Sequence, residues 1–333
     1  MLRLLNYVNI MLYLNRYIMI FISQYKEDDC FMPKVIALCM PCTDHLLHVD
    51  KLPRSNGGAR ILDESWQGGG NSATAIVAVG AQGVSAGIIC AVGDDDYGVA
   101  QIVDFKRFNV DTSHIQVRKD TETPVNLCIS DEETNGRSFL GKWRRSSPIA
   151  VEDLDMDYLL TADYLLIDSN TPATQKAAKA ILDKGGDVIF DASMYSETQE
   201  AMLPFTSVYI TSEFYYKTRY GEDKNIFDCC RDMMAKGPHT VIFTLGEKGC
   251  YVAGEEKEGF HAAIPVRVTD TTGGADAFIS ALAVYLNEKC PFEEALDYAL
   301  KAAAFCVSRQ GTLPAMVDRT TLESYIVNIY ENR

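Results

Sequence analysis

The residues with the clearest chemical potential lie near the C-terminus, where positions 270–278 read DTTGGADAF and an apolar helical pattern follows. The small residues Gly273, Gly274 and Ala275 predict a helix start whose first backbone N–H groups lack partners within the helix and can bind an anion. Asp276 follows in the first turn, where its carboxylate can accept a hydroxyl proton while the amides stabilise a transferring phosphoryl group. An ordinary helix with an acidic first turn would look similar, so this pattern alone leaves both interpretations open.

Two further glycine clusters are candidate ligand sites. Positions 68–71 read GGGN, and glycines there allow close backbone approach while Asn71 can cap a helix or reach a hydroxyl. Positions 244–249 read TLGEKG, a strand end followed by a glycine turn, which is a usual place for ligand contacts in a parallel sheet. Both clusters also fit plain turns. No Gly-x-x-x-x-Gly-Lys-Ser/Thr run is present, which excludes a P-loop kinase.

The elements that must position these residues alternate along the chain from Lys34 onward. Short β-branched runs and amphipathic segments follow one another, which predicts parallel strands with crossover helices on both faces of a sheet. The predicted strands are 35–39, 84–92, 164–168, 187–191, 208–211 and 240–245. The predicted helices are 72–79, 97–108, 174–182, 226–235, 277–287 and 292–309.

Two segments interrupt this alternation. Residues 46–66 and 125–140 lack helical periodicity, and they carry the hairpin signals Asn56-Gly57-Gly58 and Asn135-Gly136. We expect them to form a small accessory sheet outside the main layer.

Composition restricts the function classes. The chain has 333 residues, enough for a large core, and with 47% hydrophobic and 23% charged residues it has the composition of a soluble globular protein. A net charge of −15 argues against a nucleic-acid partner, since phosphates need a basic surface. The ten cysteines show no metal-binding or disulfide-framework spacing, which favours buried reduced thiols and a cytoplasmic location.

The first 31 residues differ from the rest. Residues 1–23 are rich in Leu, Ile, Met and Tyr, but Arg16 and three asparagines interrupt them, and no small-residue cleavage site follows. We expect Met32 to be the biological start and residues 1–31 to be an upstream translation artefact or a disordered extension. A membrane anchor is the alternative, although no membrane partner is expected of the remaining chain.

Together, in this order and spacing, the motifs resemble those of the ribokinase-like (PfkB) carbohydrate kinases, from Lys34 to about residue 328. The N-terminal signature is similar to residues 68–73 and continues through 80–83 and 92–98, while residues 270–278 are similar to the C-terminal signature. The resemblance implies a three-layer α/β/α fold, here over residues 32–330, with a β lid formed by segments at about 46–66 and 120–143. It also implies transfer of the γ-phosphoryl group of ATP to a sugar hydroxyl with Mg²⁺ as cofactor, and it allows a monovalent cation. A homodimer formed through the lid is expected as well.

The resemblance assigns site residues by their match to the family motifs. Catalysis is expected of Asp276 as the base with Gly273, Gly274 and Ala275, and sugar binding of Asp44, Gly69, Gly70 and Asn71. Arg144 is added to the sugar-binding residues for its charge, without a match to a family motif. Nucleotide binding is expected of Thr244, Gly246, Gly249, Thr272 and Ser212, and metal binding of Asp270 and Glu213.

Three positions depart from the family pattern. The usual Gly-Ala-Gly-Asp is Gly-Gly-Ala-Asp here, so a Cβ at Ala275 could crowd the phosphoryl group or forbid a positive φ. In the family's Asn-x-x-Glu motif, Ser212 replaces Asn and Tyr215 replaces Glu, which affects the expected Mg²⁺ geometry. Cys39 stands where a glycine in the first strand is common.

The substrate is the least determined part of the hypothesis. Lys142-Trp143-Arg144-Arg145 is a basic cluster in an acidic protein, and it either reads an anionic substituent of the sugar or is a solvated surface run. A nucleoside kinase of the same fold is one alternative. A catalytically weakened sugar- or nucleotide-binding sensor is another, although a pure binder would not need Asp276.

Overall fold

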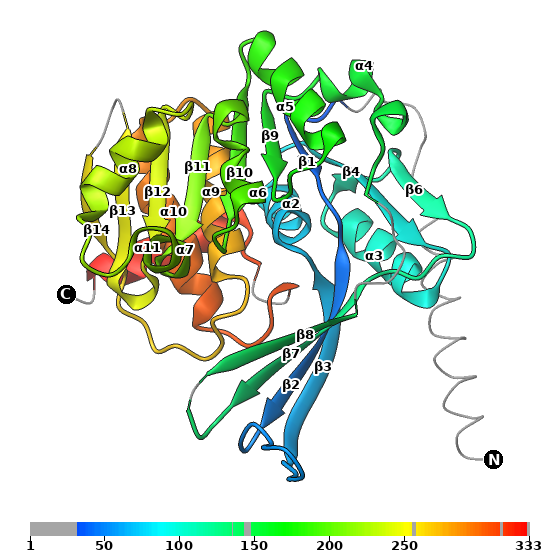
Figure 1. Cartoon of the computed structure of the whole chain (residues 1–333), viewed down its shortest axis with the longest axis vertical. Coiled ribbons are helices and arrows are strands. Elements are labelled where there is room, and N and C mark those ends of the chain that lie inside the picture. The colour runs from blue at the N-terminus through cyan, green and yellow to red at the C-terminus, as the bar shows by residue number, and fades with distance from the viewer. Residues whose placement is uncertain (1–31, 135, 143–147, 255–257, 314–315, 332–333) are drawn as a thin grey trace. The chain divides into compact units, whose positions relative to one another are not determined.

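Strands from both halves of the chain form one large sheet, in the order β14-β13-β12-β11-β10-β9-β1-β4-β5, with β6 pairing β4 (Figure 1). Pairing is parallel from β12 to β5 and antiparallel through β12, β13 and β14. A computed structural model describes residues 32–134, 136–142, 148–254, 258–313 and 316–331. The strands are β1 (Val35–Leu38), β4 (Ala86–Gly93), β5 (Val110–Asp111), β6 (Ile115–Arg118), β9 (Tyr164–Ile167), β10 (Asp187–Ala192), β11 (Val208–Ser212), β12 (Thr240–Thr244), β13 (Gly249–Gly254) and β14 (Glu258–Ala262).

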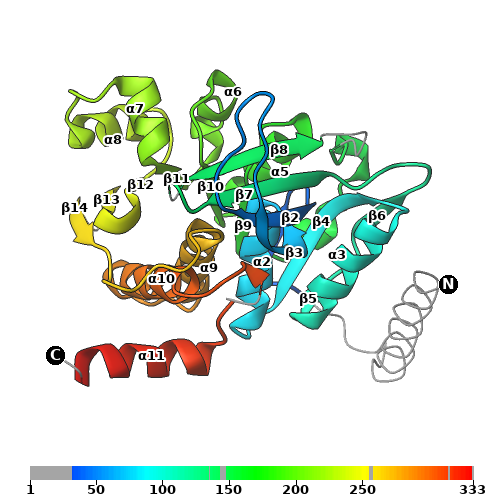
Figure 2. The same cartoon turned by 90° about the horizontal axis from the view of Figure 1, so that it is seen from below.

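Helices cover both faces of this sheet (Figure 2). Successive residues of one strand enter opposite cores: Leu166 of β9 packs in one apolar cluster, and its neighbours Leu165 and Ile167 pack in the other. The helices are α2 (Asn71–Ala81), α3 (Asp96–Arg107), α4 (Met156–Leu159), α5 (Pro172–Asp183), α6 (Glu197–Glu200), α7 (Glu213–Tyr220), α8 (Ile226–Met234), α9 (Gly274–Asn287), α10 (Phe292–Val307) and α11 (Arg319–Glu331).

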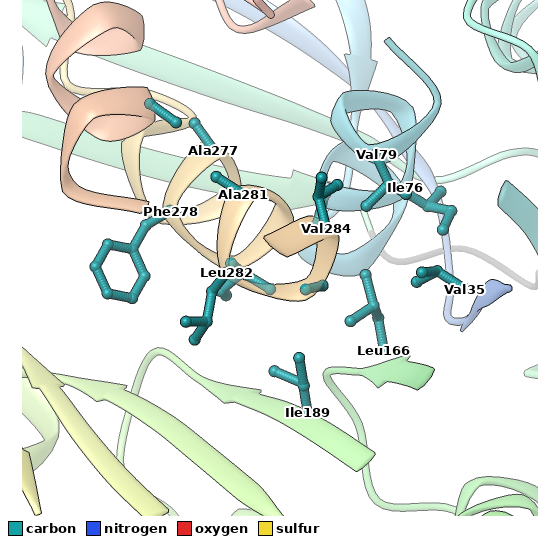
Figure 3. Packing of buried hydrophobic residues seen from close by; sticks show 14 of the residues in the cluster. Val35, Ile76, Val79, Leu166, Ile189, Ala277, Phe278, Ala281, Leu282 and Val284 are labelled. Atoms are coloured by element: carbon teal, nitrogen blue, oxygen red, sulfur yellow. The ribbon is translucent and has the colours of Figure 1, made fainter. Parts of the chain in front are cut away.

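Helices α2 and α9 pack side by side against the same face of the sheet (Figure 3). Ile76 and Val79 of α2 lie beside Val284 of α9, and Leu282 of α9 lies toward Ile189 of β10. Burying these side chains removes apolar surface from water, at roughly 25 cal/mol per Å². Because this core holds both helices in place, it also determines where their N-termini lie relative to the ends of the strands.

The predicted α/β/α fold is confirmed, and the predicted strands and helices form with ends shifted by a few residues. Local signals explain several boundaries. Thr171 caps α5 through the Thr174 amide and Pro172 opens that helix, while Asp95 accepts from the Gly98 amide at the start of α3. The antiparallel extension β13–β14 and the short helices α4, α6 and α7 were not predicted.

A second sheet of four strands forms from the two segments that lacked helical periodicity (Figure 1). Its order is β3 (Ile61–Gly69), β2 (Cys42–Val49), β7 (Val125–Asp131) and β8 (Arg137–Lys142), with antiparallel hairpins joined by the parallel β2–β7 pair. Asn56 has a φ of 62° in the β2–β3 connection, as the Asn-Gly signal predicts. Asn135, in the other hairpin signal, lies outside the described residues.

Two expectations concern the N-terminus and the cysteines. Residues 1–31, to which the hypotheses of an extension or an anchor apply, lie outside the described residues. Across the described ranges, no helix has the length and apolar character needed to cross a membrane. The described cysteines are free thiols, and all of them except Cys290 are buried.

Candidate active site

Among the described residues, no side chain caps the N-terminus of α9. Gly273 is the N-cap residue in a left-handed conformation, with φ 81°, and the first intrahelical hydrogen bond runs from the Ala277 amide to the Gly273 carbonyl at 2.9 Å. The amides of Gly274 and Ala275 precede that bond and lie at the positive end of the helix dipole. Asp276 follows, partly exposed, in the first turn. This end of α9 can therefore place an anion beside a carboxylate.

The positive φ of this turn falls on Gly273 and not on Ala275. Ala275 is exposed and helical, so the departure from the family pattern does not forbid the backbone conformation. Gly273 itself could not be replaced easily, because a Cβ there would lie 2.3 Å from Cγ2 of the buried Thr312.

On the second sheet, Asp44 is buried and held by neighbouring polar groups. Its Oδ1 accepts from Asn126 Nδ2 at 3.2 Å and from Cys42 Sγ at 3.4 Å. Burial raises the pKa of this carboxyl above its ordinary value. A Cβ at Gly69 would lie 2.2 Å from Asp44 Oδ2, so the glycine leaves the space that the carboxylate occupies. Gly70, with φ 99°, is the N-cap residue of α2.

A polar cluster lies where α2 begins and where β9 and β10 end. Asn71 Nδ2 donates to Asp191 Oδ2 at 2.9 Å and to Ser193 Oγ at 2.8 Å. The Ser72 amide donates to Asp168 Oδ2 at 2.9 Å. In the sheet, β4 lies on one side of β1, and the later strands β9 to β12 lie on its other side. The polar cluster is therefore at the point where the strand order reverses, and open α/β sheets bind ligands at such a point.

Sequence reasoning did not single out Asp168, Asp191 or Ser193. Burial and the adjacent Asp168 raise the pKa of Asp191 to about 7, and burial raises that of Asp168 as well. A signal was present, because each aspartate ends a predicted buried strand. A strand that ends in aspartate is not by itself evidence of a site; the structure adds that β9 and β10 are neighbours, which brings the two carboxylates together.

The predicted nucleotide-side turn follows β12. Thr244 Oγ1 donates to the Thr211 carbonyl at 3.0 Å, which ties the ends of β11 and β12 together. Gly246 and Gly249 have φ values of 58° and 116°. A Cβ at Gly249 would lie 2.0 Å from the carbonyl oxygen of His261, so this turn requires glycine.

Ser212 and Glu213, at the start of α7, have defined partners. Ser212 Oγ donates to the Ser193 carbonyl at 2.6 Å, which connects α7 to the end of β10. Glu213 Oε1 lies 3.1 Å from Lys248 Nζ and 3.2 Å from Lys217 Nζ, and these lysines lower its pKa. Tyr215, at the family's glutamate position, is fully buried in the core.

Asp270 uses both carboxylate oxygens within the protein. Its Oδ1 accepts from the Thr272 amide at 2.9 Å, and its Oδ2 accepts from the Gly311 amide at 3.1 Å. In the described ranges, no group of three His, Cys, Asp or Glu side chains is placed to hold a metal ion. Arg144 and Arg145 lie outside the described residues.

Comparison with known proteins identifies relatives of the whole domain. The model of a family described as pfkB family carbohydrate kinase matches residues 35–319. An ATP-dependent ribose-1-phosphate kinase of Halopiger xanaduensis is 26% identical over 277 residues, which cover 82% of this chain and 91% of that protein.

Two solved structures have a similar fold. Arabidopsis thaliana ribokinase, complexed with ribose and ATP, is 21% identical with a TM-score of 0.78, covering 88% of this chain and 98% of that chain. An Escherichia coli protein described as a ribokinase II, complexed with ATP and Mg²⁺, is 21% identical with a TM-score of 0.76, covering 89% of this chain and 99% of that chain.

Proposed function

Because the chain belongs to the pfkB family of carbohydrate kinases, we propose that it transfers the γ-phosphoryl group of ATP to a sugar hydroxyl with Asp276 as the general base. Family membership makes the protein a phosphotransferase with an alcohol acceptor. The role of Asp276, the sugar and the individual ligand contacts are the proposal.

The observation that carries this proposal is the uncapped start of α9. Many helices satisfy one of their first amides with the side chain of the N-cap residue, whereas Gly273 has no side chain to do so; we propose that the Gly274 and Ala275 N–H groups bind a ligand instead. Negative charge spreads over the phosphoryl oxygens during transfer, and amides at a helix start stabilise such charge without reorganising. Asp276 lies one residue further along the same turn.

In the proposed reaction, the sugar hydroxyl oxygen attacks the γ-phosphorus as its proton passes to the Asp276 carboxylate. The new P–O bond forms while the bond to the bridging oxygen of the β-phosphate breaks, and ADP leaves. The amides of Gly274 and Ala275 hold the phosphoryl oxygens through this step. Positioning and charge stabilisation supply most of the acceleration in phosphoryl transfer.

We propose that the sugar lies between the second sheet and the start of α2, where Asp44, Gly69, Gly70 and Asn71 offer hydrogen-bond partners. Asp168, which no motif suggested, extends this polar surface at the end of β9. We assign the nucleotide to the turn after β12, beside Thr244, Gly246 and Gly249, and we propose Ser212 and Thr272 as further contacts. The second sheet then acts as a lid that excludes water.

We propose no resident metal site at Asp270 or Glu213, because both carboxylates already have partners among the described residues. Glu213 is paired with two lysines, and both oxygens of Asp270 accept backbone hydrogen bonds. Mg²⁺ commonly binds through substrate phosphates and water with few protein ligands. We therefore propose that Mg²⁺ enters as part of the MgATP substrate, and we assign no step to a protein-bound metal or to a monovalent cation.

An anionic acceptor is the substrate class that we propose. Residues 142–145 carry three basic side chains in a strongly acidic chain, and they begin at the last residue of β8, which suggests that they bind an anion. The Halopiger relative is named for a phosphorylated sugar. Recognition by Arg144 or Arg145 would supply charge-assisted hydrogen bonds. A nucleoside acceptor is the second candidate, because the exposed aromatic side chain of Phe139 lies on the same face of the second sheet as Asp44.

We also propose a homodimer formed through the second sheet, in the cytoplasm. Register places Trp66, His45, Leu127 and Leu140 in one row across the four strands, on the face opposite Asp44. Trp66 and Leu140 are 50% and 59% exposed, so this face carries large apolar side chains in one row that a second copy could cover. Light scattering of the purified protein tests the dimer, and free buried thiols support the reducing compartment.

The test of the function is a coupled ADP-release assay over ribose, fructose, ribose 1-phosphate, a keto-acid sugar and adenosine. We expect ADP release with at least one sugar, and faster release with an anionic sugar than with its neutral counterpart. Release with adenosine alone would favour the nucleoside kinase. Binding of sugar or ATP without any ADP release would favour the sensor and contradict the proposal.

A further inference from the structure

The turn at residues 310–312, between α10 and α11, joins the second sheet to the segment before α9. The Thr312 amide donates to Gln67 Oε1 at 2.9 Å, and Gln310 Nε2 donates to Asp63 Oδ2 at 2.8 Å. Both acceptors belong to β3 and lie on one face of it, because they are four residues apart. Gln67 and Thr312 are 245 positions apart in sequence, so this contact exists only in the folded chain.

The same turn also contacts the proposed phosphoryl-binding segment. The Gly311 amide donates to Asp270 Oδ2 at 3.1 Å, and the other oxygen of Asp270 accepts from the Thr272 amide at 2.9 Å. Thr312, 2% exposed, packs directly against the Cα of Gly273, where no Cβ would fit. A displacement of the turn would therefore move Gly273, the residue that sets the start of α9.

The sheet end of this connection lies beside the proposed sugar site. Gln67 is directly opposite Asp44 in the β2–β3 register, so the two side chains share a face with Cβ atoms about 4.5–5.5 Å apart. Gln67 is thus a neighbour of the residue proposed to bind the sugar, and it bonds to the turn that supports the phosphoryl-binding residues.

Packing alone does not explain a glutamine at this position. Gln67 Nε2 is buried and has no hydrogen-bond partner among the described residues. Leaving a buried donor unsatisfied is costly, and a methionine would fill similar space without that cost. The amide oxygen that accepts from Thr312 is what a methionine could not supply.

We propose that Gln67 is a positioning residue, which couples the position of the sugar-binding sheet to the phosphoryl-binding start of α9 through the 310–312 turn. The coupling deepens the proposed function and rests on it. A sugar that holds β3 in place would, through Gln67 and Thr312, hold Gly273 in place as well. Acceptor binding and nucleotide binding would then strengthen each other by equal factors.

The first test needs no substrate. Amide hydrogen exchange of the full-length protein is compared between wild type and Gln67→Met, and the readout is the peptide covering residues 268–277. We expect that peptide to exchange about threefold to tenfold faster in the variant, as for loss of one hydrogen bond. Ser65→Ala is the matched control, since Ser65 lies on the same strand and face between Asp63 and Gln67; it should exchange like wild type.

Gln310→Met removes the hydrogen bond to Asp63 at an exposed position away from Asp44. It should also make the 268–277 peptide exchange faster, but by a smaller factor than Gln67→Met does. Unchanged exchange over 268–277 in both variants would overturn the proposal. Equal acceleration in all peptides would overturn it too, because that result indicates general destabilisation.

The second test measures AMP-PNP affinity with and without ribose 1-phosphate or ribose, whichever releases ADP in the acceptor assay. The wild type should bind AMP-PNP more tightly with the acceptor present, and Gln67→Met should lose most of that gain while its affinity without acceptor changes less than about threefold. An undiminished gain would contradict the coupling. If no acceptor releases ADP, the proposed function fails, while the exchange result still decides whether the turn couples the two segments.

Discussion

Gly273→Ala perturbs the start of α9 in a way that the structure allows us to quantify. The alanine would adopt φ near 81°, which costs roughly 1–2 kcal/mol for an L-residue with a Cβ. Its Cβ would also lie 2.3 Å from Thr312 Cγ2, and relieving such overpacking in a buried site costs about 1–3 kcal/mol. We expect the free energy of unfolding to fall by about 2–5 kcal/mol in urea denaturation, with kcat reduced because the amides of Gly274 and Ala275 move.

Gly185→Ala separates the two costs. Gly185 has φ 85°, and apart from its chain neighbours no atom of the described residues lies within 4 Å of the place that a Cβ would take. Its replacement should therefore cost the backbone contribution alone and leave kcat unchanged. Thr312→Ser removes Cγ2, and in the double variant it should recover part of the stability lost in Gly273→Ala. Equal destabilisation by Gly273→Ala and Gly185→Ala, or no recovery by Thr312→Ser, would refute the packing argument.

Three further predictions concern single residues. The pKa of Asp191 is raised to about 7, above the usual carboxyl value near 4, so the native state binds more protons than the unfolded state and its stability falls as pH rises from about 4 to 7. Asp191→Asn should therefore raise the free energy of unfolding relative to wild type more at pH 8 than at pH 5; an equal shift at both would contradict this. Ala275→Gly keeps the amide and removes the methyl, so kcat should stay equal or rise, and a sharp fall would mean that the segment binds differently. Arg144→Ala should raise KM for an anionic sugar about tenfold to a hundredfold, as expected for loss of a charge-assisted contact, and leave a neutral sugar nearly unaffected; equal effects on both would make Arg144 a surface residue.

Sequence patterns predicted those features that depend on local interactions. The Gly-Gly-Ala-Asp run indicated the uncapped start of α9, the alternation of strands and helices indicated the three-layer fold, and an Asn-Gly pair indicated the β2–β3 hairpin. Each signal acts within a few residues, through backbone conformation or side-chain periodicity.

The contacts that assemble the site were not predictable in the same way. The proximity of Asp168 and Asp191 depends on which strands are neighbours, and the hydrogen bond from Thr312 to Gln67 joins distant parts of the chain. Glu213 shows the reverse case, since its motif suggested a metal ligand while its position beside Lys248 gives it an ion pair. Single-residue chemistry is readable from sequence, but the partners of a residue come from the tertiary fold.

The most direct test of the central claim is the kcat of Asp276→Asn with the acceptor that releases ADP fastest, measured together with the binding of that acceptor and of AMP-PNP. If Asp276 is the base, kcat should fall by at least about a hundredfold while both affinities stay nearly unchanged. Asp157→Asn makes the same substitution in the first turn of α4 and should behave as wild type. Undiminished turnover by Asp276→Asn would contradict the mechanism.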